Sequence, residues 1–404
     1  MELTPIYRSV VAIDVHQSKL TVCALFEGEQ GEVQVQIEEF GGFKRDRRAM
    51  AEWVASFEPE VVVMESTGIY WKSPYAALEK VGIQALVVNA YHVKQVPGRK
   101  TDIADAQWLA ILARSGLLKG GFVPPSNFRH LRLLSRQLQK LTGILAGEKN
   151  RLHKVLSDGG IRLSAVVSDI HGKSARQMVK GLLAGESPQQ VLVYASKRLK
   201  ATEEELLDAL EGELSATHRF VLSQILEHIE YLEERIGCFQ QQLLKELEPQ
   251  RGILHALQTI PGLDEIGAAM LLVEIGDDMQ AFGCAEKLAA WAGVCPGNNE
   301  SAGKRKAGKR RKGNPYVRHI LCEAANAASR TRSALAEKFK ALLIRRGRKR
   351  AIFALAHKIL KIVFVLISRC DYYRDATVDY EAISVERNAP RWIRMLRKYG
   401  YIAA

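Results

Sequence analysis

The chain is 404 residues long, with 47% hydrophobic and 25% charged residues. This length fits two or three domains of ordinary size, and the composition excludes wholesale disorder and collagen-like repetition. The 58 Lys and Arg outnumber the 45 Asp and Glu, so the net charge of +13 points to a polyanionic partner. Six scattered cysteines without a C-x-x-C pair, and no signal peptide before them, predict a cytoplasmic protein without a disulfide framework or a zinc site.

The first 90 residues alternate between strand-like and helix-like patterns. We predict strands at residues 10–14, 20–26, 33–40, 61–65 and 85–88, and helices at residues 45–57 and 73–81. The first three strands are joined by short turns and indicate an antiparallel meander. The order βββ followed by αβαβ predicts a mixed sheet covered by helices, an α/β domain over residues 1–125.

The middle of the chain, residues 126–250, has a helical pattern. After a predicted helix at 101–118, Pro124 and Pro125 close the first domain. Apolar residues then recur at three- and four-residue steps in 131–155, with Glu148 at the one skipped step, and in 225–247. This pattern predicts two long helices with a coiled-coil seam. An antiparallel hairpin within one chain and a dimer zipper fit this pattern equally well. Glycines and a proline between the two segments predict an additional helical subdomain.

Residues 251–404 form a third, mostly helical predicted domain, with helices at 286–292, 317–328 and 350–368. Residues 257–269 resemble a helix-hairpin-helix, whose turn can present N–H groups to a phosphate, although a plain helix turn fits as well. The apolar stretch 351–367 carries His357, Lys358 and Lys361, so we predict a buried helix of a soluble protein and no membrane span.

The positive charge is concentrated in residues 301–358, which contain 18 Lys and Arg and two acids, a net charge of +16. The remainder of the chain therefore carries a net charge of −3. Such a window can be a solvated basic face, but its dense runs favour a surface that neutralises the phosphates of a nucleic acid. The predicted nucleic-acid-binding residues are Lys304, Arg305, Lys306, Lys309, Arg310, Arg311, Lys312, Arg345, Arg346, Arg348, Lys349 and Arg350.

Four carboxylates are the candidate metal ligands. Asp14 and Glu65 each end an apolar strand, and they would project from one edge of a sheet if the strands are parallel. Asp102 and Asp105 share one face of a helix. If that face packs over the sheet edge, four acids converge and would bind Mg²⁺ or Mn²⁺, which can serve phosphodiester transfer. Taken singly, each acid can also be a solvated strand end or a first-turn helix residue.

Ser301 lies in a turn-rich segment, residues 296–304, and is followed by three cations. Cationic neighbours hold phosphate and stabilise a phosphoryl-transfer transition state, so Ser301 is a candidate nucleophile. A phosphate-binding loop whose serine merely bonds to the backbone is the alternative. No Walker pattern occurs, so nucleotide hydrolysis has no support.

Several blocks in this order resemble the DEDD transposases of bacterial insertion sequences, a family described as bridge-RNA-guided recombinases. The matching blocks are AIDVH at 12–16, MESTG at 64–68, PGRKTDIADA at 97–106, PGNNESAGK at 296–304, and parts of 308–318 and 346–351. The resemblance implies a RuvC-like, RNase H-type first domain with the metal-binding tetrad Asp14, Glu65, Asp102 and Asp105. It also implies a coiled-coil middle and a C-terminal transposase domain in which Ser301 is the nucleophile.

In this family a covalent phosphoserine link joins protein and DNA, and a noncoding RNA pairs with donor and target. The resemblance therefore implies a DNA recombinase that moves its own element in the bacterial cytoplasm. The expected partners are DNA at the element ends and the target, a guide RNA, and further copies of the chain in a dimer or a tetramer on DNA, with active sites composed from two subunits.

Two other functions remain open at this stage. A Holliday-junction-resolvase-like endonuclease would use the carboxylates alone, and Ser301→Ala would leave its cleavage intact. A nucleic-acid-binding scaffold would need no metal chemistry, although all four tetrad positions are acidic here.

Overall fold

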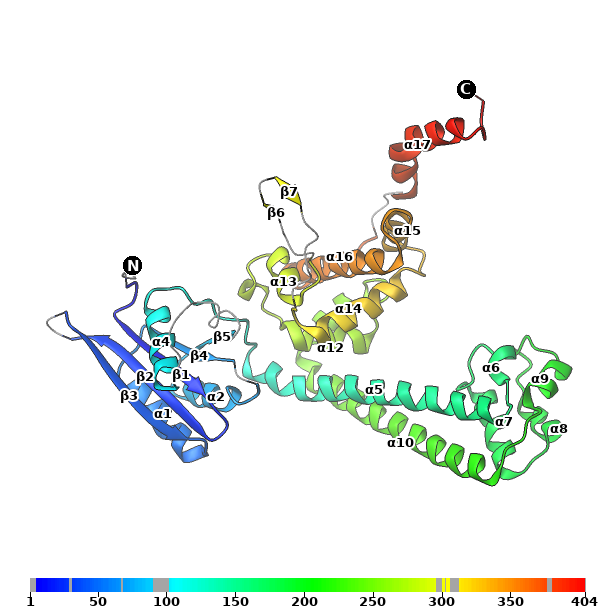
Figure 1. Ribbon diagram of the computed structural model, residues 1–404, viewed down its shortest axis with the longest axis horizontal. Coiled ribbons are helices and arrows are strands. Elements are labelled where there is room, and N and C mark those ends of the chain that lie inside the picture. The colour runs from blue at the N-terminus through cyan, green and yellow to red at the C-terminus, as the bar shows by residue number, and fades with distance from the viewer. Residues whose placement is uncertain are drawn as a thin grey trace. The chain divides into compact units, whose positions relative to one another are not determined.

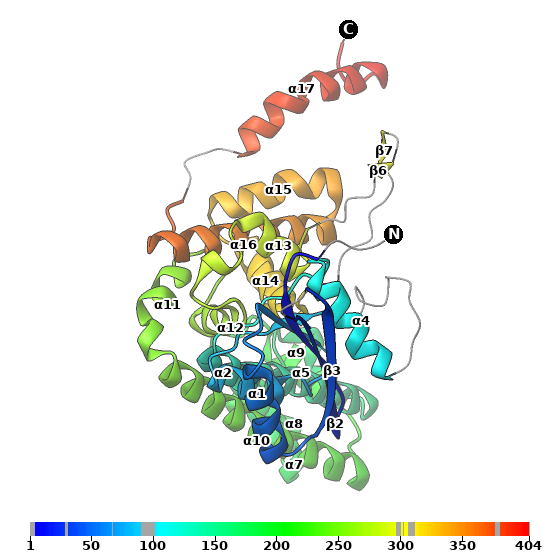
Figure 2. The same ribbon diagram turned by 90° about the vertical axis from the view of Figure 1, so that its left-hand side faces the viewer.

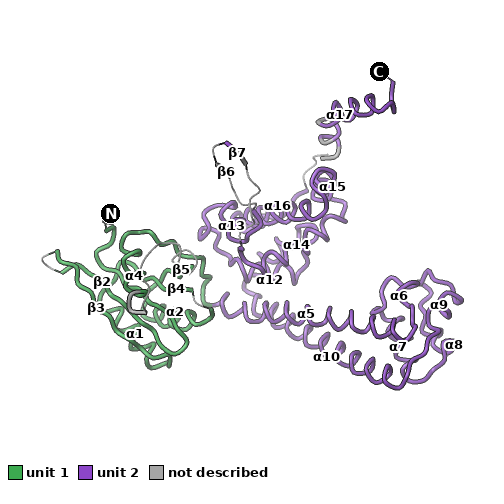
Figure 3. The backbone as a smooth tube through the Cα atoms, in the orientation of Figure 1, with its two compact units in different colours: residues 1–126 green, residues 127–404 purple. Residues whose placement is uncertain are grey.

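The computed structural model describes residues 5–28, 31–66, 68–89, 102–295, 300–301, 303–305, 312–375 and 380–403. The chain divides into two compact units, residues 1–126 and residues 127–404 (Figure 3). Each unit has its own buried core. Lys306, Lys309, Arg310 and Arg311, all predicted to bind nucleic acid, lie outside the described residues.

A five-stranded mixed sheet forms the first unit (Figure 1). Its strands are β1 (Ser9–Val15), β2 (Lys19–Glu27), β3 (Val33–Gly41), β4 (Val61–Glu65) and β5 (Leu86–Val88). The order across the sheet is β3-β2-β1-β4-β5, with β1 to β3 antiparallel and with β4 and β5 parallel to β1. The predicted meander and mixed sheet are confirmed.

Helices cover both faces of this sheet because its central strands are apolar on both sides. Val11 and Ile13 pack with residues of α1 (Lys44–Ala55) and α2 (Lys72–Lys80). On the opposite face, Val10 and Ala12 pack with the helix α4 (Asp102–Arg114). Successive side chains of a strand alternate between faces, so residues at even positions of β1 point toward α4.

The direction of α4 is fixed at its last residue, Arg114. The backbone N–H groups of Ile6 and Tyr7, just before β1, donate hydrogen bonds to the carbonyl oxygen of Arg114, at 2.8 and 3.2 Å. The Arg114 Nη2 atom lies 2.6 Å from Oε1 of Glu27 at the end of β2. The C-terminus of α4 is therefore at the start of β1, and its first turn lies toward the opposite end of that strand.

Two long helices, α5 (Ser126–Asp158) and α10 (Ala216–Glu246), begin the second unit. Three polar pairs join them: Asp158 with His218, Glu148 with His228, and Lys149 with Glu233. The end of α5 thus pairs with the start of α10, and earlier residues of α5 pair further along α10, so the helices are antiparallel. Of the two arrangements that the sequence left open, the single chain adopts the hairpin.

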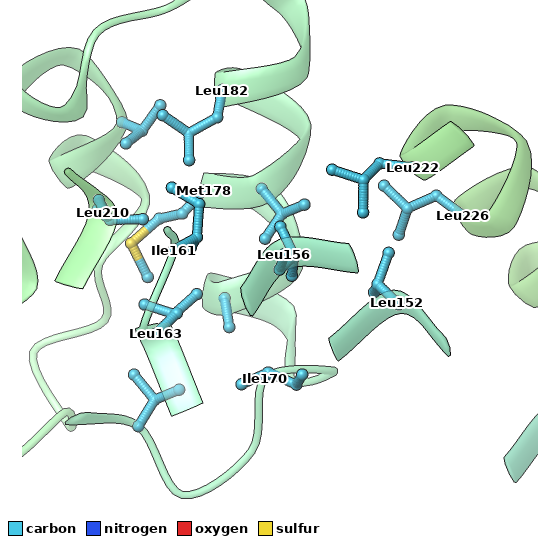
Figure 4. Close-up of a cluster of buried hydrophobic side chains, with 14 of the residues drawn as sticks. Leu152, Leu156, Ile161, Leu163, Ile170, Met178, Leu182, Leu210, Leu222 and Leu226 are labelled. Atoms are coloured by element: carbon cyan, nitrogen blue, oxygen red, sulfur yellow. The ribbon is translucent and has the colours of Figure 1, made fainter. Parts of the chain in front are cut away.

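Short helices cap the far end of this hairpin. They are α6 (Leu163–Val166), α7 (Lys173–Ala184), α8 (Pro188–Val191) and α9 (Glu203–Leu210). Their core contains Met178 and Leu182 of α7, which lie with Leu152 and Leu156 of α5 and Leu222 of α10 (Figure 4). The predicted helix breaks are thus present between these short helices. The helices nevertheless share one apolar core with the ends of α5 and α10.

In its described residues, the rest of the unit contains helices and one small β-hairpin. Its helices are α11 (Arg251–Gln258), α12 (Glu265–Ile275), α13 (Ala285–Ala292), α14 (Pro315–Ala328), α15 (Ala334–Arg346), α16 (Arg348–Arg369) and α17 (Tyr380–Lys398). Both views place α15 beside α16 (Figures 1 and 2). By length and composition α16 could cross a membrane, but it packs against α11, α13, α14 and α15 as a core helix does.

The turn between α11 and α12 uses its glycine for packing. Gly262 has a φ of +87°, and a Cβ there would lie 2.4 Å from the backbone oxygen of Ala324 and the backbone nitrogen of Ala328. Because the turn contacts the α14 backbone so closely, this glycine faces protein. The glycine thus has a packing role in this turn, and the resemblance of residues 257–269 to a helix-hairpin-helix stays a prediction.

Candidate active site

Asp14 and Glu65 lie next to each other at one edge of the N-terminal sheet. Strands β1 and β4 are parallel neighbours, and Ile13 is in register with Met64. The next residue on each strand is a carboxylate, and adjacent strands are about 4.8 Å apart. Both side chains are half-buried. The prediction that these two acids share a sheet edge is confirmed.

Both acids also belong to the sheet face that α4 covers. Asp14 shares its face with Val10 and Ala12, and Glu65 shares its face with Val63, all of which pack with α4 residues such as Ala106. The first turns of α4 lie toward this end of β1, as the contacts of its last residue require.

The two α4 acids occupy the first turns of that helix. Asp102 is its first residue, although the Asp102 side chain lies outside the described residues. Asp105 is exposed. The backbone thus brings the α4 acids toward the edge formed by Asp14 and Glu65. Among the side chains described, no group of three or more His, Cys, Asp or Glu forms a ready metal site.

The chemistry of this edge fits a hard divalent cation. Asp14 and Glu65 supply carboxylate oxygens, which Mg²⁺ and Mn²⁺ prefer. On the next strand, Thr21 lies opposite Asp14 and is 2% exposed. Its Oγ1 is 3.4 Å from Oε1 of Glu39, and Nζ of Lys19 is 3.1 Å from the same oxygen. Because the Glu39 carboxylate is paired with Lys19 and Thr21, we do not count it among the candidate metal ligands.

Ser301 lies in a short β-hairpin of the second unit. Strands β6 (Glu300–Ser301) and β7 (Lys304–Arg305) are antiparallel, and Ser301 pairs with Lys304 across the ladder. Gly303, in the turn, has a φ of +73°, a conformation that glycine adopts without steric cost. The backbone therefore holds Ser301 opposite a lysine, beside the tip of the hairpin. The side chains of Ser301, Lys304 and Arg305 lie outside the described residues.

Two glycines hold the base of this hairpin segment together. Gly293 follows α13 and Gly313 precedes α14, and both have positive φ angles. A Cβ on Gly313 would lie 2.4 Å from the backbone nitrogen of Gly293 and 2.5 Å from its Cα. Since the backbones touch at this point, a side chain at Gly313 would push the two ends of the segment apart.

A buried ion cluster anchors the residue that follows this base. Glu274 of α12 is fully buried, and its two carboxylate oxygens lie 2.8 and 3.0 Å from Nε and Nη2 of Arg136 on α5. Nε of Arg132 is 3.3 Å from the same carboxylate. Asn314 donates from Nδ2 to Glu274 at 2.8 Å and caps α14 with its Oδ1. One carboxylate thus ties the hairpin's exit to α5.

The cluster keeps its charges despite burial. Burial lowers the pKa of Arg132 to about 10, so this guanidinium is still a cation at neutral pH. Burial alone would raise the pKa of Glu274, but the hydrogen bond from Arg136 and the charge of Arg132 hold that pKa below its ordinary value. The carboxylate and both guanidinium groups are therefore ionised at neutral pH.

The sequence did not reveal this cluster. Its available signals were a lone acid in the apolar run of α12 and two arginines four residues apart on α5.

Besides Lys304 and Arg305 on β7, the predicted basic residues whose side chains are described occupy two places in the second unit. Lys312 is exposed just after the hairpin segment. The second group lies at the junction of α15 and α16 and is exposed throughout: Arg345, Arg346, Arg348, Lys349 and Arg350. Arg348 also donates from Nη2 to Asn326 at 3.3 Å. Five adjacent exposed cations suit contacts with phosphates.

Comparison with known proteins agrees with this arrangement. Residues 11–159 match a DEDD family model described as "Transposase", and residues 254–340 match one described as "Transposase IS116/IS110/IS902 family". Together these matches span more than half of the chain. The chain belongs to the IS110 family of transposases.

Two curated relatives extend the match over most of the transposase. The transposase for insertion sequence element IS1111A of Coxiella burnetii is 26% identical over 333 residues, 80% of this chain and 81% of that protein. The y4pF/y4sB protein of Sinorhizobium fredii is 25% identical over 343 residues, 82% of this chain and 79% of its own. Two structures of Thermus thermophilus RuvC, one with a Holliday junction substrate, align with 28% of this chain and 99% of theirs, at 16% and 17% identity and a TM-score of 0.22.

The candidate residues of the transposase fall inside the matched regions. Asp14, Glu65, Asp102 and Asp105 lie within residues 11–159, and Ser301 lies within residues 254–340. The exposed basic junction at 345–350 lies beyond the second match.

Proposed function

We propose that this transposase cuts DNA at the ends of its insertion sequence and at the target, and rejoins the strands through a nucleophilic serine. In this proposal the carboxylates Asp14, Glu65, Asp102 and Asp105 hold Mg²⁺ or Mn²⁺, and Ser301 attacks the phosphodiester. Attack by the serine oxygen forms a phosphoserine bond and releases the 3′- or 5′-hydroxyl of the cut strand. Attack by a DNA hydroxyl on that bond then rejoins a strand and frees the serine.

The observation that carries the carboxylate half is the register of β1 and β4. It puts Asp14 and Glu65 side by side on the sheet face covered by α4, which begins with the other two acids. Adjacent carboxylates repel each other unless a cation lies between them. A bound divalent ion would stabilise the charge that develops on the phosphate and on the attacking or leaving oxygen.

The serine half is supported by the hairpin backbone. Ser301 is paired with Lys304, and Arg305 follows on the same strand. Cations at these positions offset the negative charge of a phosphate at the serine. Gly293 and Gly313 are in close backbone contact at the two ends of this segment, and Glu274 binds Asn314 next to them. These contacts fix the position of the base of the hairpin segment.

The nucleic-acid partners follow from the exposed basic junction and from the family. Lys312 and the cations of residues 345–350 would contact the phosphates of DNA or of a noncoding guide RNA that pairs with donor and target. We further propose that the transposase acts as a homo-oligomer in the bacterial cytoplasm, because the tetrad and Ser301 belong to different compact units and two copies could complete each site.

A cleavage assay on labelled element-end DNA, with guide RNA and Mg²⁺, tests the metal half. Asp14→Asn and Glu65→Gln should abolish cleavage, whereas Glu52→Gln, an exposed carboxylate of α1 paired with Arg48, should leave it intact. EDTA should abolish cleavage by the wild type, and added Mn²⁺ should restore it. Cleavage that persists in Asp14→Asn would contradict the assignment.

A further inference from the structure

A row of cations follows one face of α5 in its first half. Arg129, Arg132, Arg136 and Lys140 are spaced by three, four and four residues, which places them on one side of the helix. We call these four residues the α5 basic stripe. It extends about 16 Å along the helix axis. No acidic residue occurs between Ser126 and Gly147, so the first two thirds of α5 carry no negative side chain, and the acids of this helix, Glu148 and Asp158, lie in its last third. It lies outside the basic window predicted from the sequence.

The stripe lines a surface pocket of about 440 Å³ between α5 and α14. Arg132, Arg136 and Lys140 contribute the charge, and Gln137 and Gln139 contribute amide groups. Tyr316 of α14 forms the facing wall. Such a mixture of cations, amides and one aromatic ring is typical of surfaces that bind a nucleic-acid strand.

The buried carboxylate of Glu274 does not neutralise all of the positive charge of the pocket. Glu274 contacts both Arg132 and Arg136, so one negative charge faces two positive ones, with Lys140 in addition. The contact with Glu274 uses two of the five N–H donors of Arg136, those on Nε and Nη2. The guanidinium is therefore held in place from below while it keeps donors for a second acceptor. A phosphate oxygen is the acceptor that a fixed arginine fork suits best.

Two further features of the same place concern Tyr316 and Gln139. The guanidinium carbon of Arg136 lies 4.4 Å from the centre of the Tyr316 ring, so the two groups are stacked and orient each other. Nε2 of Gln139 is shielded from solvent and has no hydrogen-bond partner among the residues that the structure describes. Buried donors are nearly always paired in native proteins, so this amide calls for an acceptor.

The pocket is linked to the serine hairpin through a single short segment. Tyr316 is two residues from Asn314, which Glu274 holds at the exit of the hairpin segment. A strand bound along the stripe would therefore lie beside the base from which β6 and β7 extend. These elements belong to one compact unit (Figure 3).

We propose that the α5 basic stripe and Tyr316 bind a single DNA strand, with its phosphates on the cations and a base against the tyrosine. The contacts described above support the binding surface itself. We take the bound strand to be the one that Ser301 cuts, and this part of the inference rests on the proposed function. Aromatic stacking requires an unpaired base, which favours a single strand over a duplex.

The test measures binding of the full-length transposase to fluorescein-labelled oligothymidylate by fluorescence anisotropy over a series of salt concentrations. Lys140→Gln should reduce the slope of log K against log salt by about 0.7, the value for one phosphate contact on a single strand. The matched control is Lys154→Gln, an exposed lysine of α5 outside the stripe, which should leave the slope unchanged. Neither lysine contacts Glu274, so folding of the cluster is preserved.

A second pair of variants tests the aromatic contact. Tyr316→Leu should weaken binding about fivefold or more at fixed salt, as loss of one stacked base does. Tyr231→Leu is its control, because Tyr231 lies on α10 and stacks with Arg235 at 5.6 Å, outside the pocket. Unfolding curves of each variant show whether a loss of binding reflects a loss of folding.

Equal slopes for Lys140→Gln and the wild type, or equal losses for the two tyrosine variants, would overturn the proposal. Oligouridylate serves as the RNA arm, and a loss confined to RNA would also overturn it. If cleavage proves independent of Ser301 while the stripe variants still lose binding, the proposed chemistry fails and this inference stands.

Discussion

Glu274→Gln should destabilise the helical unit strongly. The Glu274 side chain is 0% exposed and balances Arg132 and Arg136, which are 16% and 31% exposed. Removing one partner of a buried ion pair costs about 3 to 5 kcal/mol, because the remaining charge is left uncompensated. Both guanidinium groups keep some access to water, so we expect the lower end, about 3 kcal/mol.

Glu233→Gln is the matched control. Glu233 also contacts two cations, Arg176 at 2.7 Å and Lys149 at 2.9 Å, but its side chain is 32% exposed. Exposed pairs contribute about 1 kcal/mol or less, because water screens them. The two variants should therefore differ by about 2 kcal/mol, which corresponds to roughly 4 to 8 °C in Tm for a unit of this size.

Thermal melts followed by circular dichroism at the helical minimum measure this difference, since the helices are concentrated in residues 127–404. Equal Tm values for Glu274→Gln and Glu233→Gln would refute the reasoning, because burial would then contribute nothing to the energy of the cluster.

Three further results are expected. Gly262→Ala should destabilise the protein more than Gly347→Ala in chemical denaturation, because both glycines have positive φ angles but only a Cβ at Gly262 meets backbone atoms within 4 Å. The hydrogen bond from Arg176 lowers the pKa of Glu233 to about 2 from 4.5, so its stabilising effect is complete above pH 4.5 and is lost as the pH falls toward 2. Melts of Glu233→Gln and the wild type should therefore converge over that interval. Burial raises the pKa of the Cys23 thiol to about 11, so iodoacetamide at pH 8 should spare Cys23 and modify the exposed Cys238 and Cys370, as peptide mass mapping would show.

The sheet could be predicted because its signals are local. Apolar runs such as residues 10–13 and 61–64 have the length and composition of buried strands, and each ends in an acid. Side chains alternate along a strand. If β1 and β4 are parallel, as they are, Asp14 and Glu65 must therefore lie at the same edge and on the same face of the sheet.

The ion cluster and the α5 basic stripe could not be predicted in the same way. Glu274 and Arg136 are separated by 138 residues, and neither the acid in α12 nor the arginines of α5 specify a partner. The helix α17 was not among the predicted helices, the last of which ended at residue 368. At Gly262 the local pattern indicated a turn, but the close packing of this glycine against the α14 backbone depends on residues far away in the sequence and could not be predicted.

The most direct test of the account is covalent trapping of DNA on Ser301. The purified transposase is incubated with Mg²⁺, labelled element-end DNA and RNA transcribed from the flank of the element, and the products are resolved on a denaturing gel. The account predicts a protein–DNA adduct with the wild type that is absent with both Ser301→Ala and Asp14→Ala. Cleavage without an adduct, equally efficient in Ser301→Ala, would contradict the serine mechanism and leave an endonuclease that uses the carboxylates alone.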